Sequence, residues 1–404
     1  MSLAHPLRLT ANVRARLKSR MEMRSRAREA RQHFKNDPRF DPQLLQDGFR
    51  SRLADKSDDT ELLQRIVSAY RLATAQEANV PTAYRPTAWW ERVRATKLGP
   101  VRQALFDGDI PALNRMYSNF FRDPCGAGLT GLPQFIAKDC FGTGLSKAHS
   151  HFILGDALHR LDLWKQRSHG ETPLQDLRGT DVGNPFGILF EDTLVRTRSE
   201  YHHFTARRLA SRMKPGASTV AELGGGYGET AYYLLRDTPG ITYINFDVPE
   251  TIALASYYLM KTLPGLPFTL YGEGDPHEAS REGARVILMP VSELPHFPGR
   301  SADVVLSAHT LSDLSAEAVD EYLRQVERIT RCYFQSITVG PAAERIHSCI
   351  RSACPRLGLV EWITANWNGR MHGRMDEMET LYRLTAPRVT GATSKDLYPA
   401  DPAT

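Results

Sequence analysis

The sequence predicts a mixed α/β fold in which a mainly helical N-terminal half precedes a doubly wound, mostly parallel sheet. Three observations lead to this prediction. From about residue 218, short apolar runs rich in β-branched residues alternate with amphipathic segments of helical spacing. Before that point, apolar residues between 38 and 150 recur at helical spacing, with Pro and Gly between the segments. The length of 404 residues suits about two domains.

The N-terminal arm, residues 1–37, carries most of the positive charge of the chain. Its first 35 residues hold ten Lys or Arg against two Glu, a net charge of +8, so the rest of the chain carries −3 of the total +5. We expect a solvated helix, a helix that docks on a partner, or a partly disordered tail. No aromatic residues are interleaved with the arginines, so the composition does not favour nucleic-acid binding despite the charge.

Residues 38–180 are expected to form the helical domain, which would lie on the substrate side and offer a surface for a homo-oligomer. Asp58, Asp59 and Thr60 supply capping residues at the start of a segment of helical spacing. A break follows at Gly99-Pro100, and "CGAGLTGLP" at 125–133 predicts a loop. We place the boundary of this domain near residues 180–200.

The C-terminal domain is expected over residues 181–390, followed by a short tail at 391–404. A helix at 197–213 leads into it, and "ETLYRLTA" at 379–386 predicts a late strand. Strands and helices alternate between these two segments, as a doubly wound sheet requires. The expected strands are 218–223, 241–248, 284–291, 302–309 and 331–339, and the expected helices are 229–237, 249–263 and 315–330.

A glycine cluster directly follows the first expected strand. In an open α/β sheet, ligands bind beyond the carboxyl ends of the strands, and glycines let the backbone lie close to the ligand. The spacing excludes a dinucleotide site, because Glu229 stands where G-x-G-x-x-G needs its third glycine. It also excludes a P-loop, since no G-K-[ST] follows. The cluster consists of Gly224, Gly225, Gly226 and Gly228.

Two acidic residues accompany the glycines and predict the cofactor. Glu222 lies at the end of the first strand, where a carboxylate would repel a pyrophosphate but suits a ligand with an ammonium and a sulfonium group. Asp247 ends the second strand, nineteen residues after Gly228, where an acid accepts hydrogen bonds from ribose hydroxyls. The arrangement predicts S-adenosyl-L-methionine (SAM), with S-adenosylhomocysteine as product. The alternative is that the glycines form only a tight turn and Asp247 only caps a helix.

The stretches "ELGGGYGE" and "YINFDVPETIALASYYL" resemble the class I SAM-dependent methyltransferases. More narrowly, the chain is similar to the sugar O-methyltransferases of bacterial polysaccharide and secondary-metabolite clusters. The segments "VGNPFGILFEDTLVRTRSEYHHFTARRLA" and "FDGDIPALNRMYSNFFRDPCGAGL" share this likeness, which covers roughly residues 85–385. The resemblance implies a Rossmann-like methyltransferase domain preceded by the helical domain.

The resemblance also implies which residues would bind the cofactor. The methionine end would lie against Glu222 and the glycine loop, and the ribose against Asp247. Adenine would lie near Val291 and Ser292, although many methyltransferases carry Asp or Asn at that place. The family tends to have a serine-rich segment with an acid after the fourth strand, and the residues that fit it here are Ser307, Thr310, Ser312 and Asp313.

Methyl transfer to a hydroxyl needs a general base, because a sugar hydroxyl is a poor nucleophile. The base should follow the fourth strand, where His309 and Asp313 are four residues apart and would share a helical face if a turn starts there. Histidine is the natural base near neutral pH. The alternative is that His309 is a packed, hydrogen-bonded residue of the core.

Further polar residues are candidates for the acceptor side. Tyr201, His202 and His203 lie on the helix before the glycine strand, and the two histidines point about 100° apart on a helix. Asn184 lies between two glycines in "VGNPFGILFED", which suits a substrate loop or a linker between domains. His372, Asp376 and Glu377 gather late in the chain, where a divalent metal is conceivable, but they lack a specific ligand spacing, so we assign no metal site.

The sequence therefore predicts a SAM-dependent O-methyltransferase acting on a sugar or a glycosylated natural product. An alternative acceptor is a peptide, with the basic arm recruiting an acidic leader segment. A third alternative is a SAM-binding or nucleic-acid-binding protein without catalysis. Five scattered cysteines without a C-x-x-C pair argue against a disulfide framework or a zinc ribbon. We expect a cytoplasmic protein, since no apolar run reaches the length of a membrane helix or a signal peptide.

Overall fold

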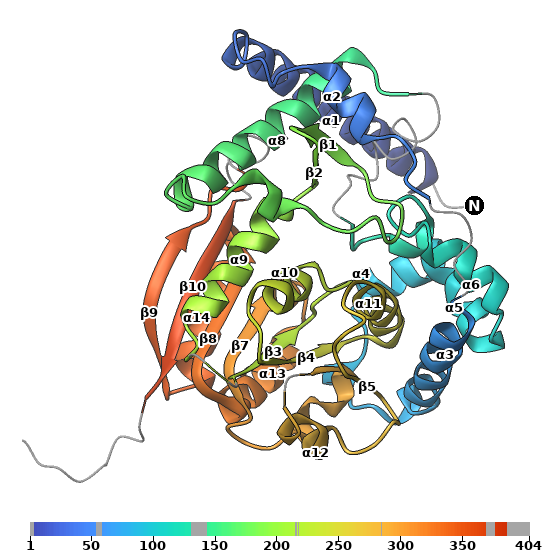
Figure 1. Ribbon diagram of the computed structural model, residues 1–404, viewed down its shortest axis with the longest axis vertical. Coiled ribbons are helices and arrows are strands. Elements are labelled where there is room, and N and C mark those ends of the chain that lie inside the picture. The colour runs from blue at the N-terminus through green and yellow to red at the C-terminus, as the bar shows by residue number, and fades with distance from the viewer. Residues whose placement is uncertain are drawn as a thin grey trace, which may run out of the picture.

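The computed structural model describes residues 4–53, 59–130, 144–214, 216, 218–283, 285–368 and 376–385. Its centre is an eight-stranded sheet, visible edge-on in Figure 1 with helices on both faces. In spatial order the strands are β5 (Phe268–Leu270), β6 (Val286–Pro290), β4 (Ile241–Asp247), β3 (Ser218–Leu223), β7 (Ala302–Ala308), β8 (Thr330–Val339), β10 (Glu377–Leu384) and β9 (Leu357–Thr364).

The sheet is mainly parallel, as the strand and helix alternation predicted. Strands β5, β6, β4, β3, β7 and β8 pair in parallel, and β10 runs antiparallel between β8 and β9. Strand β6 is buried at every residue, which is typical of a parallel strand covered on both faces. The predicted late strand is β10. The sequence analysis did not predict β5, β9 or the hairpin of β1 (Gly187–Phe190) and β2 (Thr193–Arg196).

Two apolar cores lie on the two faces of the sheet. Adjacent strand residues point to opposite faces, so Val220 belongs to one core and Ala221 to the other. Helices α9 (Ser199–Ser211), α10 (Glu229–Asp237) and α11 (Pro249–Thr262) pack in the first core. Helices α12 (Pro276–Arg281), α13 (Ala316–Ile329) and α14 (Gly340–Ala353) pack in the second. The glycine loop lies between β3 and α10, at the carboxyl edge of the sheet.

The N-terminal half is helical, but its helices share the first core with the sheet. Leu63 and Leu105 lie in the same apolar cluster as Tyr258 and Leu288. The structure therefore shows a helical layer on the sheet, and a separate helical domain remains a prediction. The helices are α1 (Ala4–His33), α2 (Pro42–Gly48), α3 (Thr60–Ala75), α4 (Ala88–Val93), α5 (Gly99–Asp107), α6 (Ile110–Tyr117) and α8 (Lys147–Arg167).

One predicted helix cap acts differently. Asp59 precedes α3, but its side chain does not cap that helix. Its carboxylate instead accepts from Lys261 Nζ at 2.7 Å and from the Tyr257 hydroxyl at 3.0 Å, both on α11. Helix α3 contacts α11, which brings Lys261 and Tyr257 within reach of Asp59. A capping rule that uses only the local sequence cannot predict such a long-range contact. Asp58, the other expected capping acid, lies outside the described residues.

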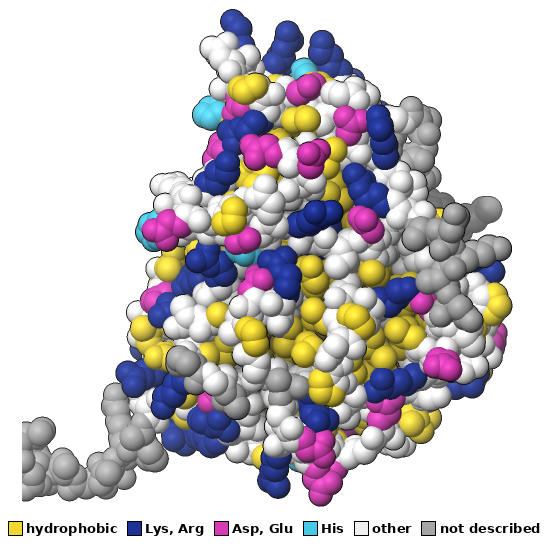
Figure 2. Space-filling model, in the orientation of Figure 1, with side chains coloured by type: hydrophobic (Ala, Val, Ile, Leu, Met, Phe, Trp, Pro, Cys, Tyr) yellow, Lys and Arg dark blue, Asp and Glu magenta, His cyan; other side chains and the backbone are white. Residues whose placement is uncertain are grey.

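The basic arm forms α1, which packs along α8 (Figure 1). Met23, Ala27 and Ala30 are buried in this contact, and a Cβ atom on Gly155 of α8 would overlap the Ala30 side chain. The arm is thus a helix docked on its own chain. Lys and Arg side chains project at the top of the molecule, where α1 and α8 lie (Figure 2). In the part of the chain that the structure describes, no helix has both the length and the apolar composition of a membrane span.

Candidate functional site

Two neighbouring cavities flank the glycine loop. The Asp247 cavity, of about 240 Å³, is lined by Asp247, Val248, Thr251 and Val291 together with residues 84–87, 89 and 90. The Glu222 cavity, of about 210 Å³, is lined by Glu222, Arg198, Tyr201, His202, Glu229 and Thr230. The two share a boundary, so one ligand could extend through both. Residues that line both are Gly128, Leu129, Gly224, Gly226, Ala308 and His309.

The glycine loop has the geometry that only glycine adopts easily. Gly224, Gly226 and Gly228 have φ angles of 72°, 59° and 96°. A Cβ atom on Gly224 would overlap Thr310 Oγ1, and one on Gly228 would lie 2.9 Å from Leu259 Cδ1. At Gly226 the nearest side-chain atom would be 3.9 Å away, so this residue faces open space. Gly225 is also tightly packed, since a Cβ atom there would lie 2.7 Å from the Tyr243 hydroxyl oxygen, so the loop offers open space to the cavities at Gly226.

Asp247 lies at the carboxyl end of β4, in the Asp247 cavity. Its Oδ2 accepts a hydrogen bond from Gly226 N at 3.1 Å, and its Oδ1 accepts one from Val248 N at 2.7 Å. Burial raises the pKa of Asp247 to about 7, although these two backbone donors act in the opposite direction. The carboxyl group is therefore held in place and would gain from further donors when a ligand binds.

Glu222 lies at the end of β3, in the Glu222 cavity, and is 2% exposed. Its carboxylate accepts a hydrogen bond from the Tyr243 hydroxyl at 2.5 Å. Burial raises the pKa of Glu222 to about 7. A cationic group in this cavity would favour the ionised carboxylate. The two acids predicted from the sequence thus lie on the two sides of one loop, each in its own cavity.

His309 directly follows β7, with a φ angle of 69°, and its N–H donates to Ile337 O at 2.7 Å. Its Nε2 lies 3.2 Å from Glu377 Oε1 and 3.3 Å from Arg198 Nη2. Arg198 in turn donates to Glu377 Oε1 at 2.6 Å. Burial alone would raise the pKa of Glu377, but Arg198 and His309 outweigh it and hold that pKa below its usual range. Both polar contacts of the His309 ring involve Nε2, which donates to Glu377 Oε1 in one tautomer and accepts from Arg198 Nη2 in the other.

Asp313 does not share a helical face with His309. Residues Thr310–Ser312 form one short 3₁₀ turn, and His309 before it is left-handed, so the spacing of an α-helix does not apply. Asp313 is exposed and lines the Asp247 cavity. His309 is the candidate base that lines both cavities.

The three residues of α9 that were predicted to lie on the acceptor side do not all line a cavity. His202 lines the Glu222 cavity, with its Nδ1 2.8 Å from Thr230 Oγ1, and burial lowers its pKa to about 4. His203 points elsewhere and accepts from Trp164 Nε1 at 3.1 Å. Burial likewise lowers the pKa of His203 to about 4. Tyr201 lines the Glu222 cavity, and its buried hydroxyl has no hydrogen-bond partner among the residues that the structure describes.

Asn184 lies away from both cavities. It is 3% exposed and has a φ angle of 56°. Its side chain accepts from Arg52 N at 2.7 Å and donates to Asn119 Oδ1 at 2.7 Å, joining two segments of the N-terminal half. These contacts give it a structural role, and its predicted contact with substrate has no geometric support here.

Three predicted cofactor residues also differ in placement. Val291 lines the Asp247 cavity, whereas Ser292 and Ser307 are not among the residues lining either cavity. Ser307 is buried within β7 beside Leu223 and Ser336. The fold places its neighbours Ala308 and His309 at the cavities instead.

The late polar cluster does not form a metal site in the described part of the chain, where no three His, Cys, Asp or Glu residues come together for a metal. Asp376 Oδ1 accepts backbone hydrogen bonds from Glu377 N at 2.9 Å and Asn368 N at 3.3 Å. Glu377 pairs with Arg198 and His309, as described above. His372 lies outside the described residues.

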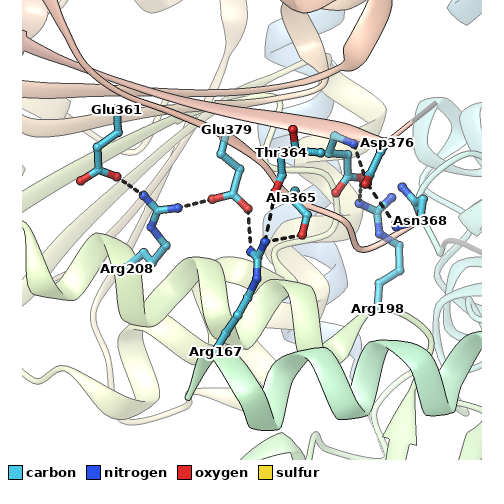
Figure 3. A network of polar contacts seen from close by, with 10 residues as sticks. Arg167, Arg198, Arg208, Glu361, Thr364, Ala365, Asn368, Asp376 and Glu379 are labelled. Carbon is cyan, nitrogen blue, oxygen red and sulfur yellow. Dashed lines mark hydrogen bonds and ion pairs between the residues drawn. The ribbon is translucent and has the colours of Figure 1, made fainter. Parts of the chain in front are cut away.

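Arg198 and Glu377 were not identified as site residues with these roles from the sequence. Arg198, which directly precedes α9, pairs with Glu377 of β10, and Figure 3 shows Arg198 among polar contacts between β9 and β10 on one side and α8 and α9 on the other. Glu379, two residues after Glu377 on the same face of β10, meets Arg208 and Arg167 in this network. Both glutamates are at most 2% exposed. The sequence signal for this network is the pair of acids at alternate positions of a late strand, because a carboxylate that is buried there needs a cationic partner.

No protein-family model and no curated protein matches this chain. Among solved structures, a SAM-dependent methyltransferase from Aquifex aeolicus is 15% identical with a TM-score of 0.33, covering 47% of this chain and 94% of its own. Magnesium protoporphyrin IX methyltransferase from Synechocystis, solved with bound SAM, is 9% identical with a TM-score of 0.35, covering 56% and 91%. The [4+2]-cyclase SpnF is 13% identical with a TM-score of 0.36, covering 57% and 96%. At TM-scores below 0.5 these likenesses carry no conclusion about activity.

Proposed function

We propose that this protein is a SAM-dependent methyltransferase that methylates a hydroxyl group of a sugar or a glycosylated metabolite. The observation that carries the proposal is the pair of buried carboxyl groups, Glu222 and Asp247, in two cavities that meet at one glycine loop. A ligand with an amino-acid end and a ribose end matches this pair. The glycine spacing disfavours a dinucleotide, since Glu229 stands where a third glycine is needed.

The residues present fit the cofactor at both of its ends. Glu222 would bind the ammonium group, and Asp247 would accept hydrogen bonds from the ribose hydroxyls. Gly226, with open space over it, would let the cofactor lie against the loop backbone. When bound, SAM supplies an activated methyl group on a sulfonium, so the protein has chiefly to position the acceptor and remove its proton.

His309 is the proposed general base. Its Nε2 faces Glu377, so the carboxylate would hold the Nε2–H tautomer and leave the Nδ1 lone pair for the acceptor hydroxyl. Arg198 keeps Glu377 ionised and fixed. Glu377 would act as a positioning residue through His309. Asp313, exposed at the other cavity, is the alternative base.

The Glu222 cavity is suited to an acceptor rich in hydroxyl groups. Tyr201, His202 and Thr230 present polar groups to it, and burial lowers the pKa of His202, which keeps its ring neutral at pH 7. Neutral donors and acceptors of this kind recognise sugar hydroxyls without demanding a charge on the acceptor.

The test is a methyl-transfer assay with labelled SAM and a panel of free sugars, nucleotide sugars and glycosylated aglycones. The proposal expects transfer to at least one member, with loss of that transfer in His309→Ala. His203→Gln is a suitable control, since His203 points away from both cavities. Binding of S-adenosylhomocysteine without transfer to any hydroxylated acceptor would contradict the O-methyl assignment.

A peptide acceptor is the second candidate, and the exposed basic face of α1 is the observation that favours it. Arg20, Arg24, Arg28 and Arg31 are exposed on the helix at spacings that place them along one side. An acidic leader segment would bind there in a salt-sensitive manner. Transfer to an acidic peptide that weakens with salt and with replacement of these arginines would favour this candidate over a sugar.

A further inference from the structure

Residues 82–94 cross the carboxyl edge of the sheet from one face to the other, and we call this segment the strap. At one end Tyr84 is buried in the core that contains α13. At the other end Val93 is buried in the core that contains α11. The strap belongs to the helical N-terminal half, yet its middle part lines the Asp247 cavity at Arg85, Pro86, Thr87, Trp89 and Trp90.

The first anchor of the strap is on α13. The Tyr84 hydroxyl donates to Glu321 Oε1 at 2.6 Å. The Tyr84 ring also stacks on the ring of Tyr322, with 5.4 Å between their centroids. Both tyrosines line the Asp247 cavity. One end of the strap is therefore fixed directly beside that cavity.

The second anchor is on the first turn of α11. Arg94, which is 4% exposed, binds Glu250 through two hydrogen bonds of 2.6 and 2.8 Å. Trp90 Nε1 donates to the same carboxylate at 2.5 Å. The indole nitrogen is thereby held on the α11 side, and the ring of Trp90 lines the cavity. A buried ion pair with a shared indole donor fixes the orientation of this aromatic side chain.

An unpaired hydroxyl lies in the same cavity. Thr251 follows Glu250 in the first turn of α11 and is 1% exposed. Its Oγ1 is buried and has no hydrogen-bond partner within the described segments of the chain. Buried hydroxyls are nearly always paired in folded proteins, so an unpaired one in the lining of a cavity points to a ligand.

We propose that the strap and Thr251 bind the adenosine end of the cofactor, with the Trp90 ring against the base and Thr251 Oγ1 as a hydrogen-bond partner. The ligand class is a purine nucleoside, because the cavity combines an aromatic wall, an unpaired hydroxyl and the Asp247 carboxyl group. The inference rests on the proposed function for the identity of the ligand. It assigns the N-terminal half a part in cofactor binding in addition to any part in acceptor binding.

The experiment compares calorimetric titrations of the full chain with S-adenosylhomocysteine and with adenosine. Stacking of a base on an aromatic side chain predicts a loss of roughly ten- to hundredfold in affinity for both probes in Trp90→Leu. Trp90→Phe keeps an aromatic ring and should stay within about fivefold of the wild type. Thr251→Val should weaken binding by about tenfold, and Thr251→Ser should restore most of it.

Tryptophan fluorescence supplies a second readout. Adenosine should quench the wild-type emission, and Trp90→Leu should remove that quenching. Trp362→Leu is the matched control, because Trp362 lies on the edge strand β9 and should leave both the quenching and the affinity unchanged.

The possible results test the role of the strap and the proposed enzymatic function separately. Binding that depends on Trp90 and Thr251 without any methyl transfer would support the strap and contradict the enzyme. Binding within about twofold of the wild type in both Trp90→Leu and Thr251→Val would overturn the strap while leaving the enzyme intact. If the wild type binds neither probe, both proposals fall.

Discussion

The two cavities beside the glycine loop differ in the chemistry of their walls. The Asp247 cavity has aromatic walls from Trp89, Trp90 and Tyr322, together with the carboxyl groups of Asp247 and Asp313. The Glu222 cavity is lined by ionisable groups that belong to a buried polar network. An aromatic wall suits a planar base, and a preorganised polar wall suits proton transfer and charge. Under the proposed function, the base and its positioning residues lie on the Glu222 side and the adenosine end of the cofactor lies on the Asp247 side, so changes on each side should mainly affect different quantities.

The largest expected effect is a loss of turnover in variants of His309 and Glu377. Removing a general base costs about a hundred- to ten-thousandfold in rate, so His309→Ala should lower kcat by that order. Glu377→Gln should lower kcat less, by about tenfold or more, because the ring remains but loses the carboxylate that positions it. Affinity for S-adenosylhomocysteine should stay within about threefold in both variants, measured by calorimetry.

Asp313→Asn is the comparison that decides between the two candidate bases. It should leave kcat close to the wild-type value if His309 is the base. A loss of turnover in Asp313→Asn equal to that in His309→Ala would move the base to the other cavity and break the division between the two sides.

The next largest expected effect is a loss of affinity for S-adenosylhomocysteine in a variant of Asp247. Asp247→Ala removes a charged hydrogen-bond acceptor from the ribose and should weaken S-adenosylhomocysteine binding by roughly ten- to hundredfold. Asp320→Ala, an exposed acid on α13, is the matched control and should change nothing. An Asp247→Ala variant with wild-type affinity and a reduced kcat would show that Asp247 belongs to the chemistry.

The pH dependence sharpens the comparison further. Burial raises the pKa of Glu222 and of Asp247 to about 7, so without ligand each stabilises the fold most in its protonated form. Stability from these two groups is present at pH 4 and is lost as the pH rises through about 7. A ligand with an ammonium group and ribose hydroxyls favours the ionised forms instead. Its affinity should therefore rise about tenfold for each group between pH 6 and 8.

Glu222→Gln checks this pH dependence by calorimetry across the same range. The variant should bind S-adenosylhomocysteine more weakly at pH 8 and show a shallower rise with pH, because only Asp247 then titrates. A wild-type affinity that is flat or falls between pH 6 and 8 would contradict the roles of both acids.

The smallest effect is expected far from both cavities. Replacing Arg20, Arg24, Arg28 and Arg31 of α1 by Gln should leave sugar methylation within about twofold, since exposed charges contribute little to stability or to a distant site. The residues buried against α8 are kept, so α1 stays docked. A large loss of activity that depends on salt would favour the acidic peptide as acceptor.

The sequence predicted most of the parallel sheet and the position of the glycine loop because those features depend on local patterns. Apolar runs such as Val286–Pro290 and the acid before the glycines can be recognised without knowing what lies beside them. The short strand β5 and the edge strand β9 were missed because a three-residue strand and an exposed edge strand lack such a pattern.

The site itself was only partly predictable, for a physical reason. Glu377, on the antiparallel strand β10 inserted between β8 and β9, contacts His309 at the end of β7, and Trp90 is held at the cavity by its contact with Glu250. Each of these contacts joins residues that lie far apart in the sequence. For Asn184 the sequence left a substrate loop and a linker open, and the side chain joins two segments of the N-terminal half.

Under the proposed function, one glycine loop with a carboxyl group on each side binds SAM and not a dinucleotide. The direct measurement is a calorimetric titration of the wild-type protein at pH 8 with S-adenosylhomocysteine and, in parallel, with NAD. We expect binding of S-adenosylhomocysteine in the micromolar range and no binding of NAD. Binding of NAD, or no binding of S-adenosylhomocysteine, would contradict the proposed function.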